Sequence, residues 1–241
     1  MVADSTLMPS SRVLVVIPAL NEEESLPRIL AEVRAVAPGY DLLVIDDGSR
    51  DRTADVARAH GVAVVSHPFN LGVGGALQTG FRWAAARGYD IVVQLDADGQ
   101  HDPRFLDALC APVIEGSCDL AIGSRYVESS GYHTPLFRRL GMLLFSFVVR
   151  LALGQRISDT TSGFRAYGRP VIKVCQHHFP KDFPDAPLLI ALARHGFRLR
   201  EVPVTMRERQ AGTSFYTLGK SLYYPYKNLI ASLMAWLQRS P

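Results

Sequence analysis

The chain has 241 residues, of which 48% are hydrophobic, and a formal net charge of +3, which allows one large α/β domain and excludes a disordered chain. Residues 1–120 hold 9 Lys and Arg against 17 Asp and Glu, whereas residues 121–241 hold 17 Lys and Arg against 6 Asp and Glu. We therefore expect the first half to bind cations and the second half to contact phosphates or an anionic membrane surface. The three scattered cysteines, the lack of a signal-peptide pattern before Ser11 and the lack of a nucleic-acid-recognition motif favour a cytoplasmic protein that binds no nucleic acid.

The first half of the chain alternates apolar runs rich in β-branched residues with segments of helical periodicity. This alternation predicts an α/β fold with a mostly parallel sheet and right-handed crossovers. Asn21 can cap the first helix, with Glu22 and two further glutamates in its first turn. We expect strands at residues 12–18, 41–47, 62–66 and 90–95, and helices after the first three of them.

Residues 70–76 form a glycine-rich entry into the helix that is expected to end near Arg87. Gly72-x-Gly74 lacks the third glycine of the dinucleotide fingerprint and does not follow the first strand, which argues against a Rossmann dehydrogenase. Because glycine lets the backbone approach a ligand closely, the turn can still line a nucleotide pocket.

An acidic cluster follows the strand expected at residues 90–95. Asp96 and Asp98 are separated by one residue, so an extended chain would direct both carboxylates to one side, with the Gln100 carbonyl nearby. In open α/β sheets ligands bind beyond the carboxyl ends of the strands, and these oxygens suit Mg²⁺ or Mn²⁺. An acidic turn that caps a helix at Pro103 is the alternative. The position after a buried strand favours the metal site.

The second half of the chain combines basic residues with two apolar stretches. A helix from Pro103 and a strand at 119–124 would bring Arg125 to the crevice that holds the acidic cluster. The apolar stretch at 136–153 is shorter than the roughly 20 residues that span a bilayer, so a buried core helix and an interfacial helix both remain open.

The remaining segments complete the predicted order of elements. Residues 159–165 form a polar turn that could hold a second phosphate, and a helix at 186–195 and a strand at 197–204 follow. A basic loop with a glycine hinge occupies residues 207–214. The apolar helical face at 218–237 could lie at a membrane interface or dock onto the domain.

Seven motifs, each weak alone, occur in the order found in one enzyme family. Together they resemble the inverting glycosyltransferases of family 2, which have the GT-A fold, and within them the dolichyl- and polyprenyl-phosphate sugar synthases. The resemblance covers about residues 12–215. The motifs are Pro18-Ala-Leu-Asn-Glu22, Asp46-Asp-Gly-Ser49, Asn70-x-Gly-x-Gly74, Asp96-Ala-Asp-Gly-Gln100, Gly123-Ser-Arg-Tyr126, Ser162-Gly-Phe-Arg165 and Arg209-x-x-Gly212-x-Ser214.

The resemblance implies an architecture as well as a fold. It implies an α/β GT-A domain at residues 1–215, with a mostly parallel central sheet, flanking helices and a candidate interfacial helix at 136–154. An amphipathic, interfacial C-terminal helix would occupy residues 216–241.

The resemblance also implies a donor site built from the first three motifs and the acidic cluster. A Mg²⁺ or Mn²⁺ ion would be held by Asp96, Asp98 and Gln100 against the donor diphosphate. The residues implied for nucleotide binding are Pro18, Leu20, Glu22, Asp46, Asp47, Gly72, Asp96 and Ala97.

The remaining motifs imply the catalytic and acceptor residues. Ser162 and Arg165 would bind the phosphate of the acceptor, and Arg209 lies on a loop that closes over the donor. The residues implied for catalysis are Asp96, Asp98, Arg125, which would contact the diphosphate, and Asp185, which stands near the place of a base in other members.

The implied reaction transfers a sugar from a nucleotide-diphospho-sugar to a polyprenyl phosphate at the cytoplasmic face of the membrane, where a small integral membrane partner is plausible. Arg50-Asp-Arg-Thr53 and Phe215 depart from the dolichyl-phosphate mannose branch, so the donor is expected to be a UDP-sugar, with UDP-N-acetylgalactosamine favoured. The alternatives are a GDP-mannose-dependent mannosyltransferase, a family 2 transferase with a non-lipid glycan acceptor, and an inactive nucleotide-sugar-binding scaffold subunit.

Overall fold

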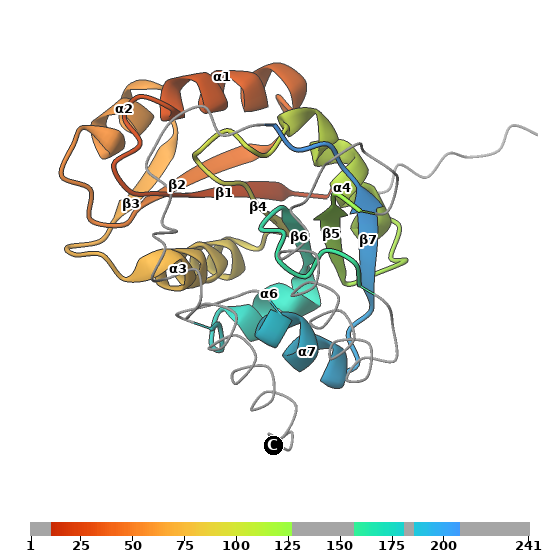
Figure 1. Cartoon of the computed structure of the whole chain (residues 1–241). Helices are drawn as coiled ribbons and strands as arrows, with labels where there is room; N and C mark the ends of the chain where they lie inside the picture. Colours follow the sequence, from red (N-terminus) through yellow and green to blue (C-terminus); the bar gives the residue numbers. More distant parts are fainter. Residues whose placement is uncertain (1–10, 127–156, 181–185, 208–241) are drawn as a thin grey trace, which may run out of the picture.

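The computed structural model describes residues 11–126, 157–180 and 186–207 (Figure 1). Their strands form one seven-stranded sheet in the order β3-β2-β1-β4-β6-β5-β7. All its neighbouring pairs are parallel except the two made by β6, so the predicted mostly parallel sheet is confirmed. The strands are β1 (Val13–Ala19), β2 (Asp41–Asp46), β3 (Ala63–Ser66), β4 (Ile91–Gln94), β5 (Leu120–Ser124), β6 (Arg165–Gly168) and β7 (Leu199–Pro203).

Helices cover both faces of the sheet, as Figure 1 shows, with α1, α2 and α4 on one face and α3, α6 and α7 on the other. Side chains alternate along β1: Val13, Val15 and Ile17 pack in the first layer, whereas Leu14 and Val16 pack in the second. The helices are α1 (Leu26–Val36), α2 (Thr53–Ala59), α3 (Gly72–Arg87), α4 (Leu106–Ile114), α6 (Arg169–Cys175) and α7 (Ala186–Arg194), with a 3₁₀ turn, η1, at Pro103–Phe105.

The start of the first helix differs from the prediction. Helix α1 begins at Leu26 rather than directly after Asn21, which has a left-handed φ of 56°. The side chain of Asn21 instead accepts a hydrogen bond from the amide of Arg50 at 2.8 Å. Asn21 therefore ties the loop after β1 to the loop after β2, because its short polar side chain tolerates a left-handed backbone and can reach across.

Strand β6 and helix α6 were not predicted from the sequence, and β6 is the one that shapes the sheet. Residues 159–165 read as a polar turn, and the turn is followed directly by a four-residue strand that inserts antiparallel between β4 and β5. A strand of four residues carries too little periodicity to be recognised, and its first residue, Arg165, is charged.

The two apolar helices expected at 136–154 and 216–241, and the site residues Asp185 and Arg209, lie outside the described residues. Among the described residues, no helix is long and apolar enough to cross a membrane. The three cysteines are free thiols and buried, and burial raises the pKa of Cys110 and Cys175 to about 12.

Candidate functional site

Most of the predicted site residues gather at one edge of the sheet. Strands β1, β2, β4 and β5 end at this edge and β6 begins there, because β6 runs antiparallel to β4 and β5. Ala19 pairs with Asp46, and Gln94 pairs with Arg165. The loops after the parallel strands therefore meet the turn before β6, as expected for a ligand crevice in an open α/β sheet.

The acidic loop after β4 presents two carboxylates of different exposure. The Asp96 side chain is 39% exposed, whereas Asp98 is 8% exposed and its Oδ1 accepts the amide of Gln100 at 3.0 Å. Gly99 makes the turn between Asp98 and Gln100 with a φ of +76°, and a Cβ there would lie 2.6 Å from the Arg28 guanidinium. The loop geometry therefore requires glycine at this position.

Within the described ranges, no three His, Cys, Asp or Glu side chains lie close enough to hold a metal by themselves. Asp96 and Asp98 supply hard carboxylate oxygens, and Mg²⁺ and Mn²⁺ are commonly held by one or two carboxylates, water and substrate phosphate oxygens. The residues present therefore fit a metal that is shared with a bound diphosphate.

The ring of His101 packs against Asp96 of this loop, and no role for it was predicted from the sequence. Its Nδ1 is 3.0 Å from the backbone nitrogen of Asp96, and its Nε2 is 3.6 Å from Asp96 Oδ2. The ring is 5% exposed and stacks on Phe164 with centroids 4.9 Å apart. Its position five residues after Asp96 was the available signal, but only the folded loop shows that the ring turns back.

The loops after β1 and β2 are joined by hydrogen bonds. The amide of Asn21 donates to Ser49 Oγ at 3.0 Å, and the amide of Glu22 donates to Thr53 Oγ1 at 2.8 Å. Pro18 and Leu20 are half-buried at the end of β1, and Asp46 is buried at the end of β2. The structure thus brings together four of the residues expected around the base and ribose, which are Pro18, Leu20, Glu22 and Asp46.

Asp47 organises the glycine-rich turn in this structure. Its carboxylate accepts the amides of Leu71 and Gly72 at 2.9 and 2.8 Å, and it contacts His67 Nδ1 at 2.7 Å. These amides stand at the start of α3, where carboxylates stabilise the helix dipole. Asp47 is 4% exposed, so its visible role is to hold the turn in place.

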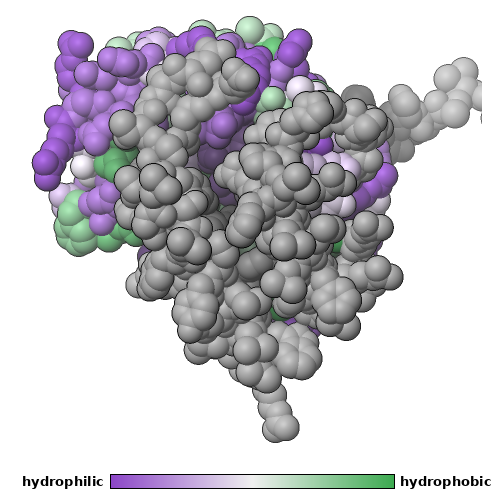
Figure 2. Space-filling view, in the orientation of Figure 1, coloured by the Kyte–Doolittle hydropathy of each residue, from purple (hydrophilic) through white to green (hydrophobic). Residues whose placement is uncertain are grey.

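An exposed apolar rim flanks this turn: Phe69, Leu71 and Val73 are 64%, 45% and 43% exposed. Figure 2 shows hydrophobic surface at the left of the molecule, over the connection from β3 to α3, whereas the surface over α1 and α2 is hydrophilic. Large exposed side chains that lie together in this way commonly mark a contact surface.

Arg125 reaches the expected edge at the end of β5 but is engaged there. Its guanidinium makes a bidentate pair with Asp159, at 2.7 and 2.8 Å, and also donates to Thr161 Oγ1 at 3.1 Å. Asp159 is fully buried, and Glu201 of β7 accepts its amide at 2.8 Å. Sequence reasoning missed Asp159 and Glu201, because both act through partners more than 30 residues away.

The turn before β6 packs against the acidic loop. A Cβ on Gly163 would lie 3.2 Å from Asp96 Oδ2 and 2.9 Å from Gln94 Nε2. Ser162 is buried, and Arg165 is 1% exposed and donates to the carbonyl of Thr160 at 3.1 Å. The structure therefore places Gly163 at the junction with the acidic loop, and it places the Arg165 guanidinium below the surface.

The chain leaving β7 also joins the acidic loop. The backbone amide of Arg207 donates to the backbone carbonyl of Gln100 at 2.9 Å. The Arg207 guanidinium donates to the carboxylates of Glu32 and Asp102 at 2.5 and 2.9 Å. Burial raises the pKa of Asp102, but hydrogen bonds from Arg104 and Arg207 outweigh it and lower that pKa below its usual value.

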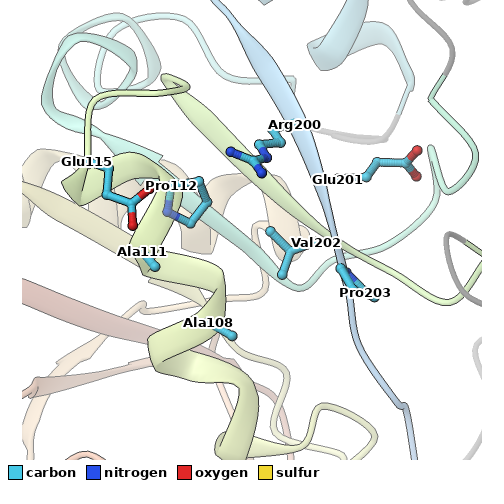
Figure 3. A pocket seen from close by; sticks show the side chains of 8 residues that line it. All are labelled: Ala108, Ala111, Pro112, Glu115, Arg200, Glu201, Val202 and Pro203. Carbon is cyan, nitrogen blue, oxygen red and sulfur yellow. The ribbon is translucent and has the colours of Figure 1, made fainter.

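A separate cavity of about 240 Å³ lies between α4 and β7 (Figure 3). Its lining includes the apolar side chains of Ala108 and Val202 and the charged side chains of Glu115 and Arg200. Glu201 also lines the cavity, and its carboxylate accepts hydrogen bonds from the backbone amides of Ser158 and Asp159. The cavity contains none of the predicted site residues.

Comparison with known protein families shows that residues 14–175 match the family "Glycosyl transferase family 2". Polyprenol monophosphomannose synthase of Mycolicibacterium smegmatis is 37% identical over 228 residues, which cover 87% of this chain and 83% of that protein. Undecaprenyl-phosphate mannosyltransferase of Micrococcus luteus is 37% identical over 217 residues, which cover 84% and 86%.

The solved structures show the same fold. Glucosyl-3-phosphoglycerate synthase from Mycobacterium tuberculosis, in complex with Mn²⁺, UDP-glucose and phosphoglyceric acid, superposes with a TM-score of 0.69 at 24% identity. The match covers 96% of this chain and 81% of that one. At this identity the similarity establishes the GT-A architecture and nothing finer.

Proposed function

Because this chain belongs to glycosyl transferase family 2, we propose that it transfers a hexose from a nucleotide-diphospho-sugar to a polyprenyl phosphate. One observation carries the proposal: the acidic loop after β4 and the turn before β6 are in contact, since a Cβ on Gly163 would meet Asp96. An enzyme that joins an anionic donor to an anionic acceptor needs both subsites within one crevice.

The donor side of this crevice is assigned to the first two loops and the acidic loop. Pro18, Leu20, Glu22 and Asp46 would surround the base and ribose, with Asp47 and Gly72 supporting the glycine-rich turn beside them. Asp96, Asp98 and Gln100 would hold Mg²⁺ or Mn²⁺ against the diphosphate, and Asp96 and Ala97 would bind the nucleotide. The hard oxygen donors support this metal assignment.

The acceptor side is assigned to the turn before β6, with Ser162 and Arg165 as the proposed phosphate-binding residues. Arg165 would act from beneath the turn, because its guanidinium holds the Thr160 carbonyl. Arg125 would face the diphosphate after exchanging part of its pairing with Asp159 for phosphate oxygens, to which guanidinium binds in the same bidentate manner. Asp185 and Arg209 keep their proposed roles as a sugar or acceptor contact and a donor-loop residue.

The reaction is a single displacement. An oxygen of the acceptor phosphate forms a bond to the anomeric carbon, and the bond from that carbon to the diphosphate oxygen breaks on the opposite face. The electron pair leaves with the nucleoside diphosphate, and the configuration inverts. A phosphate monoester is already ionised near neutral pH, so the side chains need to position it rather than deprotonate it. Bound Mg²⁺ or Mn²⁺ would supply positive charge to the leaving diphosphate.

Two observations favour different donors. The departures at Arg50-Asp-Arg-Thr53 and Phe215 favour a UDP-sugar, with UDP-N-acetylgalactosamine first among them. The two relatives that are 37% identical are named for mannose and favour a mannosyl donor. Both donors use the same crevice and the same acidic loop.

Peripheral attachment to the cytoplasmic face of the membrane follows from a lipid acceptor. The basic second half of the chain and the exposed rim formed by Phe69, Leu71 and Val73 support it. A small integral membrane partner would add a second anchor.

The test is a donor screen with purified protein, Mg²⁺ or Mn²⁺, a polyprenyl phosphate and a panel of radiolabelled UDP- and GDP-sugars, with label counted in the organic phase. We expect one donor to label the lipid and EDTA to abolish the signal. Label in water-soluble glycan instead of lipid would contradict the proposed acceptor. Nucleotide-sugar binding without any transfer would favour the scaffold alternative.

A further inference from the structure

The acidic loop after β4 and the turn before β6 share one buried side chain, His101. Its ring lies between Phe164, on which it stacks with an interplanar angle of 14°, and the backbone of Asp96. Gly163 completes this junction, because a Cβ there would lie 3.5 Å from His101 Cε1. His101 is therefore packed against both halves of the proposed crevice.

The hydrogen-bond geometry determines which ring nitrogen carries a proton. The Asp96 amide N–H points at Nδ1 over 3.0 Å, and an amide can only donate, so Nδ1 must accept and carries no proton. The proton of the imidazole ring then lies on Nε2. Nε2 is the nitrogen that faces Asp96 Oδ2 at 3.6 Å.

We propose that His101 is a positioning residue that orients the Asp96 carboxylate for the metal by electrostatic attraction from its Nε2–H group, since the 3.6 Å separation is longer than a hydrogen bond. Residues that orient a metal-binding carboxylate in this way raise its affinity for the metal without touching it. A rotamer change is resisted by the Phe164 stack and by the neighbouring backbone, where His101 forms a β-bridge with Met206. This inference rests on the proposed role of Asp96 as a metal ligand.

Two substitutions separate the two contacts of the ring. In His101→Asn the side-chain oxygen can take the place of Nδ1 and accept the Asp96 amide, but the donor that faces Asp96 Oδ2 is lost, while Gln94 Nε2 still donates to Oδ1 at 3.4 Å. In His101→Gln the longer side chain carries an N–H donor to about the position of Nε2. The matched control is His177→Asn, because His177 is exposed at the end of α6 and far from the acidic loop in the sequence.

The measurement is calorimetric titration of Mn²⁺ into the full chain with UDP or GDP present, together with thermal unfolding of each variant. We expect His101→Asn to weaken the apparent Mn²⁺ affinity by about 10-fold, His101→Gln to weaken it less, and His177→Asn to leave it unchanged. Asp96→Asn is the reference for loss of the metal ligand.

The outcomes distinguish this inference from the proposed function. Wild-type Mn²⁺ affinity in His101→Asn, or equal losses in both His101 variants that follow their loss of thermal stability, would overturn the positioning role alone. Failure of the wild-type chain to bind Mn²⁺ with either nucleotide would overturn the proposed metal site and this inference with it.

Discussion

At the scale of single residues, the crevice consists of side chains that hold one another as well as side chains that face it. Asp47 is bonded to two backbone amides, and Arg125 is paired with the buried carboxylate of Asp159. Asp96 is the more exposed acidic residue of the loop after β4. Removing a side chain that holds its neighbours should loosen the proposed crevice. Removing a side chain that faces the crevice should remove a contact with metal or substrate.

Asp98→Ala should abolish turnover while changing the thermal unfolding temperature little. Asp98 lies in a loop beyond the end of β4 and not in either apolar layer of the core. A metal bound through two carboxylates loses much of its affinity when one is removed. The measurement is lipid-linked product formation at an Mn²⁺ concentration that only just saturates the wild-type chain, so that a loss of metal affinity is not compensated. Substantial turnover by the variant would exclude Asp98 from the metal site.

Gly163→Ala should reduce turnover at least about 10-fold, because a Cβ would press on Asp96 Oδ2 at 3.2 Å and on Gln94 Nε2 at 2.9 Å. Gly39→Ala is the matched control, since a Cβ there has open space. The assay is initial rate at saturating donor and acceptor. Equal rates for the two variants would show that the turn before β6 can retreat from the acidic loop.

At the scale of elements, glycines and ion pairs set how closely the elements approach one another. Helix α3 lies on β1 at Gly80, where a Cβ would lie 2.5 Å from Val16 Cγ1. The exit from β7 is held to α1 and to the acidic loop by the pairs that Arg207 makes with Glu32 and Asp102. The crevice is therefore supported from both faces of the sheet.

Gly80→Ala should lower the free energy of unfolding by about 1–3 kcal/mol, because the added methyl group overpacks a fully buried contact. Val16 is 0% exposed and belongs to a β-strand, so it has little room to shift. Chemical denaturation checks this, with Gly39→Ala as the control of equal chemistry. Similar stability of the two variants would mean that α3 can move away from the sheet.

Asp102→Asn should destabilise the fold most at neutral pH. The folded state lowers the pKa of Asp102, so this contribution is present above the ordinary carboxyl pKa of 3.8 and is lost as the pH falls through the lower folded pKa. The difference in stability between wild type and variant, about 1–3 kcal/mol at pH 7, should therefore shrink below about pH 4.

The control for Asp102→Asn is Asp55→Asn, because Asp55 also pairs with an arginine but its side chain is 75% exposed. Exposed pairs contribute little, so this variant should match wild type at each pH. Denaturation between pH 3 and about pH 7 would compare the three proteins. A stability difference that persists unchanged into acid would remove the Asp102 ion pairs as its cause.

At the scale of the whole molecule, the acidic and basic halves of the chain supply different parts of the sheet. The acidic first half of the chain supplies β1 to β4 and the acidic loop, whereas the basic second half supplies β6, β7 and the turn assigned to the acceptor. The two halves lie side by side in one sheet, since β4 of the first half pairs with β6 of the second. The proposed metal-binding residues and the proposed acceptor-phosphate residues therefore meet at the same edge of the sheet.

Full-length protein should sediment with vesicles that contain anionic phospholipid, and the bound fraction should fall at high salt, because the net charge of the second half acts over about 10 Å at 0.1 M ionic strength. Vesicles of phosphatidylcholine alone are the control. Equal binding to both vesicles would leave apolar contact as the cause, and binding to neither would contradict membrane attachment.

The sequence alone determined the fold class and the family, and it predicted the strand ends at which the candidate site lies. Short β-branched runs predict buried strands, and strand ends predict a crevice, because both depend on local pattern and on the general geometry of parallel sheets. Asp96, Asp98 and Arg125 were predicted as site residues in this way, and the comparisons confirm the family.

Only the tertiary structure decided which side chains touch. The pairing of Arg125 with Asp159, the contact of Gly163 with Asp96, and the return of His101 beneath Asp96 follow from the insertion of β6 and from the turn at Gly99. Hydrogen bonds between residues distant in the chain depend on how loops close, and residue pattern carries no information about that closure. The sequence therefore predicts the chemistry of the proposed crevice, and the fold decides how its residues are held.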